Sequence, residues 1–229
     1  MNWYVYCGNN PVRFVDPWGL KTYLAVVGED KASNNNAFMN NVNTFIEDHP
    51  DDDVIVINAA DYDSEDALMS AIIAESENCA GIDGLLIESH GTTSALIVSS
   101  RYSLSCDANW GDIHFNQNAT IVFSGCNTGG SDGVVDDNSI AQKVANTTNR
   151  TVYAYVNSTS QIAYDKNGKV TNNWKNAVKY YQKPVRKYYN QPVVNSYTQF
   201  APSQPSRFSV SNIKEYVLSV ISRIWRVRF

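Results

Sequence analysis

Residues 85–91 read Leu-Leu-Ile-Glu-Ser-His-Gly, and residues 120–126 read Thr-Ile-Val-Phe-Ser-Gly-Cys. In both stretches a short apolar run leads directly into small and polar residues, which is typical of a buried strand that ends at the surface. Each stretch therefore predicts one strand. Each also places a reactive side chain, His90 in the first and Cys126 in the second, just beyond the carboxyl end of its strand.

The surrounding sequence predicts how these two strands are arranged. Apolar runs of the same kind predict three more strands, at residues 22–27, 54–57 and 151–156. Between the strands, apolar residues at helical spacing predict helices over residues 36–48, from a capping Ser64 onward, and near residues 139–147. Strands that alternate with helices predict an α/β fold with a mostly parallel sheet and helices on both faces. In such sheets ligands bind beyond the carboxyl ends of the strands.

Composition excludes several classes of function. The chain has 229 residues, of which 43% are hydrophobic, so it can bury one substantial core. Its net charge of −5 argues against nucleic acid as a partner, because phosphates repel an acidic surface. The four cysteines have irregular spacing, which favours free thiols over two disulfides, and no Cys/His cluster has the spacing of a zinc site. We therefore expect neither a metal nor a cofactor. We also find no signal-peptide pattern and no run long enough to span a membrane.

The two strand ends carry the residue types that a thiol-dependent reaction needs. A cysteine attacks a carbonyl group as the thiolate, so it needs a nearby base such as the His90 imidazole. The negative oxygen that develops then needs N–H donors, and glycine lets the backbone approach a substrate closely. Glu88 and Asp112 are candidates to orient His90 or to bind a basic substrate side chain, although such residues are more often simply solvated. His114 is a second and weaker candidate base. Cys79 and Cys106 are expected to be structural.

An apolar strand followed by His-Gly, and a second one followed by a small residue and Cys, resembles the pattern of the clan CD peptidases, which include the caspases. The resemblance covers roughly residues 21–160 and implies a caspase-like three-layer sandwich with cysteine endopeptidase activity on protein substrates. By the same resemblance, His90 is the general base, Cys126 is the nucleophile, and the N–H groups of Gly91 and Cys126 form the oxyanion hole. The sequence departs from caspases at Ser124-Gly125-Cys126, where they carry Gln-Ala-Cys, so substrate preference stays open.

The first twenty residues resemble a different family. They contain Tyr4-Val-Tyr-Cys-Gly-Asn-Asn-Pro11 and then Asp16-Pro-Trp-Gly-Leu20. This string is similar to the motif that ends the core of RHS/YD-repeat proteins, whose C-terminal payloads are very often toxins. The resemblance implies that residues 1–20 end a repeat shell and that the rest is a payload. It also implies secretion or delivery into a target cell as part of a larger bacterial protein, contact with the shell, and a cognate immunity protein as a further partner.

The remaining sequence predicts two more units. Residues 21–210 form the expected peptidase domain, with a turn at Asp165–Gly168 and an irregular wrap from Asp165 to Arg207. Residues 211–229 predict a basic amphipathic helix that docks on the body or on a membrane. Two alternatives to an endopeptidase follow from these features: a non-catalytic payload that binds its target through the same cleft, and a membrane-active toxin that works through this helix. Deamidation or acyl transfer would use the same nucleophile.

Overall fold

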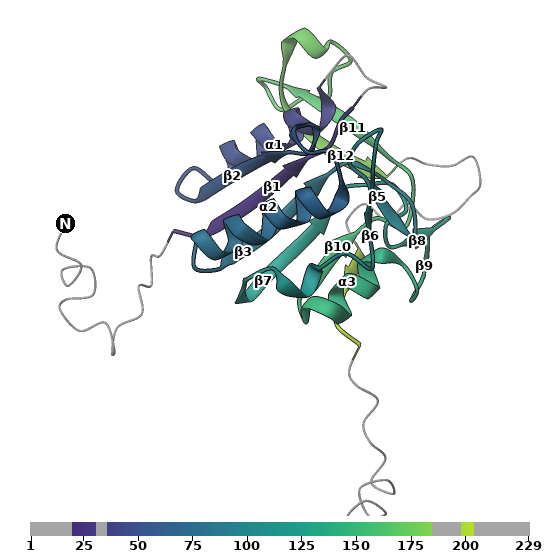
Figure 1. The fold of residues 1–229 in the computed structure, drawn as a ribbon. Coiled ribbons are helices and arrows are strands. Elements are labelled where there is room, and N and C mark those ends of the chain that lie inside the picture. The colour runs from purple at the N-terminus through teal and green to yellow at the C-terminus, as the bar shows by residue number, and fades with distance from the viewer. Residues whose placement is uncertain (1–19, 31–35, 185–197, 204–229) are drawn as a thin grey trace, which may run out of the picture.

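The computed structural model describes residues 20–30, 36–184 and 198–203. These residues form a six-stranded sheet in the order β13-β10-β7-β3-β1-β2 (Figure 1). Every neighbouring pair in this sheet is parallel except β10 and β13. The strands are β1 (Thr22–Val27), β2 (Asp53–Asn58), β3 (Ile82–Glu88), β7 (Phe115–Phe123), β10 (Thr151–Ala154) and β13 (Thr198–Phe200). The predicted α/β fold with a mostly parallel sheet is confirmed.

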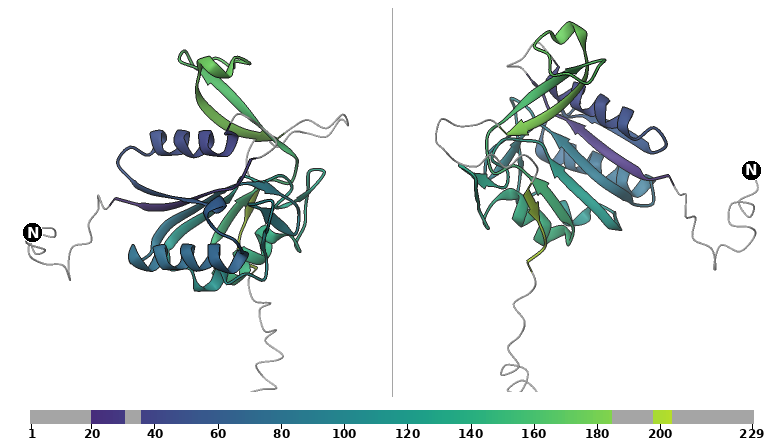
Figure 2. Two further views of the ribbon diagram at one scale, coloured as in Figure 1. Left: turned by 45° about the horizontal axis from the view of Figure 1, so that its top comes forward. Right: turned by 180° about the vertical axis from the view of Figure 1, so that it is seen from behind.

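Helices cover both faces of the sheet, as Figure 2 shows. Helix α1 (Ala37–Asp48) lies on one face, and α2 (Glu65–Asn78) and α3 (Ile140–Thr148) lie on the other. Successive side chains of a strand point to opposite faces, so β1 serves both layers. Its Leu24 and Val26 pack in the larger apolar cluster with α2. Ala25 and Val27, which point to the other face, pack in the smaller cluster with α1. The chain therefore has helix, sheet and helix layers.

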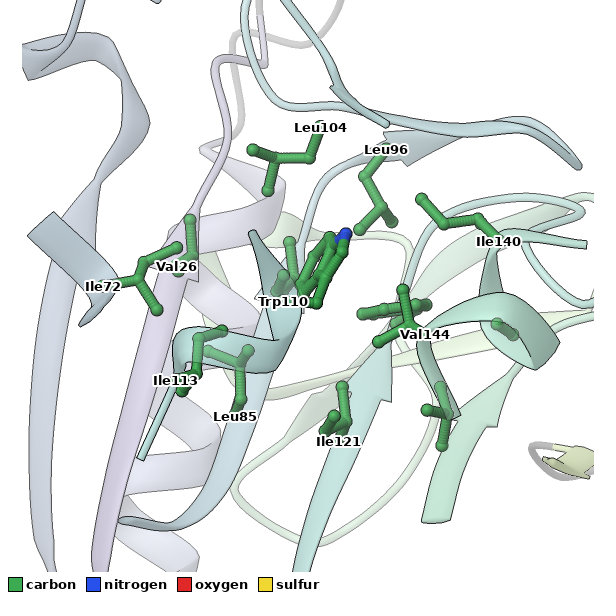
Figure 3. Close-up of a cluster of buried hydrophobic side chains, with 14 of the residues drawn as sticks. Val26, Ile72, Leu85, Leu96, Leu104, Trp110, Ile113, Ile121, Ile140 and Val144 are labelled. Carbon is green, nitrogen blue, oxygen red and sulfur yellow. The ribbon is translucent and has the colours of Figure 1, made fainter. Parts of the chain in front are cut away.

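The larger cluster is centred on Trp110, which is fully buried (Figure 3). The indole Nε1 donates to the carbonyl oxygen of Ser105 at 2.8 Å, so its polar atom is satisfied inside the core. Residues 106–118 lack the apolar run of a buried strand, but only part of this stretch is a loop. A short 3₁₀-helix η2 (Trp110–Asp112) lies in this stretch, and β7 already begins at Phe115. The first residues of β7 lack an apolar run, and they join the strand because Phe115 pairs with Ile82 of β3.

Several small elements gather at the carboxyl edge of the sheet. Strands β4 (His90–Gly91), β5 (Ala95–Ile97) and β6 (Leu104–Ser105) form a three-stranded antiparallel sheet directly after β3. Strands β8 (Gly130–Ser131) and β9 (Val134–Val135) form a hairpin after β7. A 3₁₀-helix η1 (Ala59–Asp61) follows β2. These elements build up the edge at which the predicted reactive residues lie.

A longer hairpin leaves the sheet after β10. Its strands β11 (Thr159–Asp165) and β12 (Ala177–Pro184) are antiparallel and are linked by the 3₁₀-helix η3 (Trp174–Asn176). The turn predicted at Asp165–Gly168 is present: Gly168 N–H donates to the carbonyl oxygen of Asp165 at 2.9 Å, and Gly168 has a φ of +72°. The expected irregular wrap was wrong for β12, because pairing with β11 and packing on α1 make it a regular strand.

The segments predicted at the two ends of the chain lie outside the described residues, except for Leu20 at the end of the repeat motif. The motif at residues 1–19 and the helix at residues 211–229 therefore stay predictions. Within residues 20–30, 36–184 and 198–203, no helix has the length and apolar character needed to cross a membrane.

Candidate active site

Neighbouring parallel strands bring His90 and Cys126 to the same edge of the sheet. Strands β3 and β7 are adjacent, with Ile87 of one paired to Phe123 of the other. The ladder continues one step further, because Ser124 N–H donates to the carbonyl oxygen of Ile87 at 3.0 Å. His90 is three residues beyond Ile87, and Cys126 is three residues beyond Phe123. The sheet register alone therefore places the two residues side by side.

The backbones of the two loops touch at their glycines. A Cβ atom at Gly125 would lie 3.0 Å from the Cα atom of Gly91 and 3.1 Å from its nitrogen. A Cβ atom at Gly91 would lie 2.5 Å from the Cγ2 atom of Thr128 and 2.9 Å from the carbonyl oxygen of Cys126. Real Cβ atoms essentially never approach within 3.0 Å, so this spacing of the loops requires glycine at position 91. At position 125 a Cβ atom would be unusually tight, and the loops would have to separate by a few tenths of an ångström to admit it. The His-Gly and Gly-Cys pairs thus have a packing reason as well as a chemical one.

A pocket of about 340 Å³ opens between these loops and the β11–β12 hairpin. His90 and Cys126 both line it. The other lining residues come from the loop after β1, from the start of α1, from β3 and β4, and from the hairpin: Asp30, Ala37, Phe38, Ser89, Thr159, Ser160, Gln161, Trp174 and Gln182. The predicted pair of reactive residues therefore shares one cavity that is large enough for a side chain of a substrate.

The hairpin holds the sulfur of Cys126. The backbone N–H of Thr159 donates to Sγ at 3.3 Å, and the hydroxyl oxygen of Thr159 lies 3.5 Å from the same atom. These two contacts fix the position of the sulfur at the edge of the pocket. Among the described cysteines, Cys79, Cys106 and Cys126 are free thiols, as predicted, and Cys7 lies outside the described residues. Cys79 and Cys106 do not line the pocket.

The N–H group of Gly91 points toward the Cys126 loop. In an antiparallel ladder, N–H groups of successive residues point alternately toward and away from the partner strand. Thr92 N–H points toward β5, since it donates to the carbonyl oxygen of Ala95 at 2.9 Å. The N–H of Gly91 therefore points away from β5, to the side where Gly125 packs against it. This direction is the one that an oxyanion hole shared with Cys126 requires.

Two side chains lie against the ring of His90. The ring of Phe38, on α1, meets the imidazole edge to face at 5.1 Å between ring centroids. A carboxylate oxygen of Asp30 lies 3.8 Å from Nε2 of His90. The Asp30 side chain is only 8% exposed, whereas that of His90 is 48% exposed. The acidic partner of the imidazole is therefore Asp30, which the sequence analysis missed.

The position of Asp30 follows from the loop after β1. The two residues before it are tied down by their backbone: Gly28 N–H donates to the carbonyl oxygen of Glu88, and Glu29 N–H donates to that of Val98, both at 2.8 Å. A signal for Asp30 was present in the sequence, because it lies just beyond a strand that a parallel sheet can place next to β3. The same strand-end argument that selected His90 applies to it.

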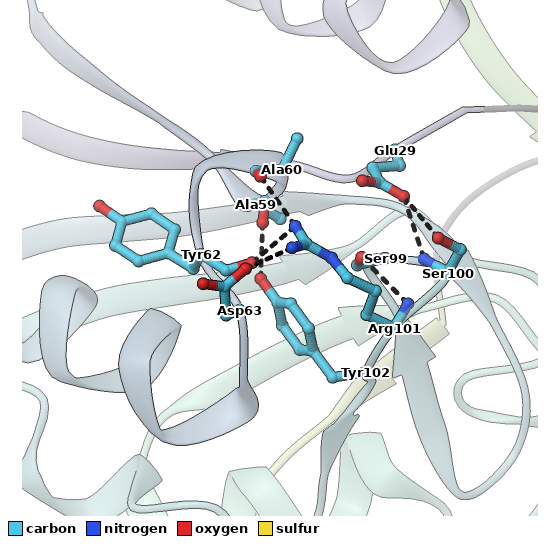
Figure 4. A network of polar contacts seen from close by, with 9 residues as sticks. All are labelled: Glu29, Ala59, Ala60, Tyr62, Asp63, Ser99, Ser100, Arg101 and Tyr102. Atoms are coloured by element: carbon cyan, nitrogen blue, oxygen red, sulfur yellow. Dashed lines mark hydrogen bonds and ion pairs between the residues drawn. The ribbon is translucent and has the colours of Figure 1, made fainter.

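A polar network around Arg101 and Ser100 also holds the loop after β1, which carries Glu29 and Asp30 (Figure 4). Arg101 forms an ion pair with Asp63 and donates to the carbonyl oxygens of Ala60 and Tyr62 at 3.0 Å each. The next residue back, Ser100, donates from its backbone N–H and from its hydroxyl to the Glu29 carboxylate, both at 3.1 Å. The loop after β2 and the loop that carries Asp30 are thus joined through one segment.

Glu88 does not orient His90 as predicted. Its carboxylate is buried, 3% exposed as a residue, and accepts hydrogen bonds from Ser124 Oγ at 2.6 Å and from Asn41 Nδ2 at 2.9 Å. Burial raises the pKa of this carboxyl to about 7, and the two hydrogen bonds oppose the rise. A side chain enclosed in this way is not available to a substrate. Glu88 instead joins the end of β3 to the Cys126 loop and to α1.

Asp112 and His114 lie away from the pocket. Asp112 belongs to η2, which packs in the apolar cluster on the face opposite to α1, and its side chain is exposed. His114 is exposed at the start of β7, near Gly81, at the amino end of the sheet. Neither residue lines the cavity of His90 and Cys126. The prediction that they could act there relied on sequence neighbours, whereas the nine-residue strand β7 separates both from Cys126.

Comparisons with protein-family models, with curated proteins and with solved structures found no match. Among the residues that the structure describes, no group of three or more His, Cys, Asp or Glu side chains could hold a metal ion. The functional argument for this chain therefore depends on the geometry of its own residues.

Proposed function

We propose that the chain is a cysteine endopeptidase of the caspase-like, clan CD type, with Cys126 as nucleophile and His90 as general base. The observation that carries the proposal is that the two residues follow adjacent parallel strands and line one pocket. A parallel sheet between helix layers supports the finer assignment to a caspase-like sandwich, as does the packing of Gly91 against Gly125.

The proposed reaction proceeds in two steps. The Cys126 thiolate attacks the carbonyl carbon of a peptide bond, and the N–H groups of Gly91 and Cys126 stabilise the negative oxygen. The carbon–nitrogen bond then breaks, and the imidazolium of His90 gives its proton to the leaving amine. This step leaves a thioester on Cys126. Water, deprotonated by His90, attacks the thioester and releases the carboxylate product and the free thiol.

Asp30 has a supporting role in this scheme. Its carboxylate, 3.8 Å from Nε2 of His90, stabilises the imidazolium that forms when His90 takes up a proton. Because His90 is half exposed, solvent screens this interaction, and we expect it to contribute modestly. Asp30 is therefore a positioning residue rather than a third member that the reaction requires.

The biological setting is a proposal that rests on the N-terminal motif. In this setting the peptidase is the payload of an RHS-repeat protein, acts as a toxin on proteins of a target cell, and is held in check by a cognate immunity protein. A membrane contact through residues 211–229 belongs to the same proposal. These segments lie outside the described residues, so the argument for peptide-bond cleavage does not depend on them.

The test compares a proteome digested by the wild-type chain with one digested by Cys126→Ala, using mass spectrometry of new peptide termini. We expect new termini only with the wild-type protein. Cys126→Ala and His90→Ala should each lower turnover by several orders of magnitude, and the double variant should be little worse, because the residues act as a unit. Full activity in Cys126→Ala would refute the assignment.

Two other cysteines provide matched controls. Cys79→Ala and Cys106→Ala remove free thiols that lie outside the pocket, so both variants should keep near wild-type activity. A thiol alkylator should modify Cys126 first and abolish activity with that modification. Products that carry deamidated or transferred acyl groups, without new termini, would instead favour another use of the same nucleophile.

A further inference from the structure

A single buried carboxylate, that of Glu88, joins the two loops that carry the reactive side chains. Glu88 ends β3 and precedes His90 by two residues. Its Oε1 atom accepts from the hydroxyl of Ser124 at 2.6 Å, and Ser124 precedes Cys126 by two residues. Glu88 is 3% exposed and Ser124 is fully buried. The proposed base and the proposed nucleophile are therefore connected beneath the pocket by one short hydrogen bond.

The second carboxylate oxygen of Glu88 is connected to the opposite wall of the pocket. Oε2 accepts from Nδ2 of Asn41, on α1, at 2.9 Å, and Oδ1 of Asn41 accepts from Nε2 of Gln161 at 2.9 Å. Gln161 lies on β11 two residues after Thr159, whose backbone N–H donates to the sulfur of Cys126. A continuous set of hydrogen bonds thus runs from Glu88 to the strand that contacts the sulfur.

Two further parts of the site are attached to the same residue. The backbone carbonyl oxygen of Glu88 accepts from Gly28 N–H at 2.8 Å, two residues before Asp30. Asn41 follows Phe38 by three residues on α1, and the ring of Phe38 contacts the imidazole of the proposed base. The loop after β1, helix α1, the loop after β7 and the hairpin therefore all meet at Glu88, which does not itself line the pocket.

We propose that Glu88 is the residue that positions this site: its side chain fixes His90 and Cys126 relative to each other and to the strand that contacts the sulfur. The inference rests on the proposed function, since the distance between base and nucleophile matters for a reaction in which one activates the other. Glu88 acts through position alone, because it is enclosed and lies outside the pocket. A displacement of about 1 Å in a reacting group can lower a rate about 100-fold.

The positioning role requires the hydrogen bonds of Glu88 and not its negative charge. Burial raises the pKa of this carboxyl to about 7, so both the protonated and the ionised form are present near neutral pH. The hydroxyl of Ser124 donates to the carboxylate and can turn to accept from the carboxylic acid, so this contact is kept in both forms. A neutral side chain of the same shape should therefore replace Glu88 in this role.

Two substitutions of similar length separate hydrogen bonding from shape. Glu88→Gln keeps a donor and an acceptor for the two contacts, whereas Glu88→Met fills the same space without them. Glu88→Gln should keep kcat near the wild-type value. Glu88→Met should lower kcat about 100-fold with little change in KM, because the residue lies outside the pocket. Equal kcat values in the two variants would overturn the inference.

Stability distinguishes positioning from a merely structural role. At pH 8.5 the wild type holds a buried charge, and Glu88→Met removes that charge together with the two hydrogen bonds. The two losses have opposite effects on stability, so the midpoint of urea unfolding should change little at this pH while kcat falls. If kcat falls only in proportion to the unfolded fraction, the residue is structural and the inference is rejected.

Ser124→Ala breaks the link to the nucleophile alone and keeps the inference testable if Glu88→Met does not fold. It should lower kcat at least several-fold, and adding it to Glu88→Met should cost little more, because both changes remove one contact. Ser76→Ala is the matched control. Ser76 is also fully buried and donates from its hydroxyl to the carbonyl oxygen of Ile73 at 2.7 Å, but it lies at the amino end of the sheet, where it accepts from His114 N–H. Equal kcat values in Ser124→Ala and Ser76→Ala would contradict the positioning role.

Alkylation of Cys126 separates this inference from the proposed function, because it needs the thiol and its base but no peptide. Modification by iodoacetamide is followed by mass spectrometry, with the free thiol of Cys106 in the same chain as internal reference. The rate at Cys126 relative to Cys106 should fall in Glu88→Met, where His90 no longer reaches the thiol proton, and stay unchanged in Glu88→Gln. This result without any peptide cleavage would support the positioning role and reject the peptidase. Cleavage that depends on Cys126, with unchanged kcat and alkylation in Glu88→Met, would reject the positioning role and keep the peptidase.

Discussion

Replacing Glu88 by Gln should make the protein more stable at alkaline pH and leave it almost unchanged at acid pH. The buried carboxyl has a pKa of about 7, against an ordinary value of 4.5 in the unfolded chain. Between these two values the folded state holds a proton that the unfolded state has released. The free energy of unfolding of the wild type therefore falls as the pH rises from about 4.5 to about 7, and stays reduced above that.

The size of the effect follows from the same pKa values. A shift from 4.5 to about 7 corresponds to about 3 kcal/mol of lost stability above pH 7. Glutamine has the same shape and can keep both contacts: its oxygen accepts from Asn41, and its amide donates to Ser124, whose hydroxyl can turn to accept. A less favourable geometry would cost about 1 kcal/mol at every pH. We therefore expect a gain of about 2 kcal/mol at pH 8.5.

Urea unfolding of the wild type and Glu88→Gln at pH 5 and at pH 8.5 measures this directly. The difference in unfolding free energy between the two proteins should change by about 3 kcal/mol between the two pH values. Glu47→Gln, at an exposed position of α1, is the control and should show no such change. A difference that is the same at both pH values, to within about 1 kcal/mol, would mean that Glu88 is not held in a buried and proton-binding state.

Three further predictions address the site and the fold. Asp30→Asn should lower kcat several-fold. The ratio of the wild-type kcat to that of the variant should fall at 1 M salt, because salt screens the contact between Asp30 and half-exposed His90. A ratio that does not change with salt would contradict an electrostatic role. Gly91→Ala should lower kcat at least about 100-fold, because its Cβ atom would push the Cys126 loop away, and steady-state kinetics with a thermal unfolding control would show whether the fold survives. Ser64→Ala removes the hydroxyl that accepts from Ala67 N–H at 3.2 Å, so it should cost about 1 kcal/mol in urea unfolding while kcat/KM stays unchanged.

The layered core was predictable because its strands and helices have strong local signals. The run at residues 22–27 alternates between two buried faces, and the helix after Ser64 carries both a cap and an apolar face. What the sequence did not show was structure that arises from pairing. Neither the start of β7 nor β12 contains an apolar run, and both become strands because a neighbouring strand satisfies their backbone groups.

The same distinction holds for the candidate site. His90 and Cys126 follow strong apolar runs, so the sheet register could be used to predict that they meet. Asp30 also follows an apolar run, at residues 22–27, whereas Gln161 could not be chosen in this way. Asp30 depends on backbone hydrogen bonds of the two residues before it, and Gln161 depends on a hairpin whose docking on α1 has no local signal. The acidic residues that the sequence suggested failed because proximity along the chain does not fix the direction of a side chain.

The β11–β12 hairpin links the position of the Cys126 sulfur to helix α1 and to the end of β3. Thr159 at the start of β11 donates to the sulfur, and Gln161, two residues later on the same strand, donates to the carbonyl oxygen of Ala37 and to Oδ1 of Asn41. Asn41 in turn donates to the buried Glu88 carboxylate, so the hairpin cannot shift without breaking contacts inside the body. The hydrogen bonds of Gln161 to α1 therefore also hold Thr159, and with it the sulfur of the proposed nucleophile, in place.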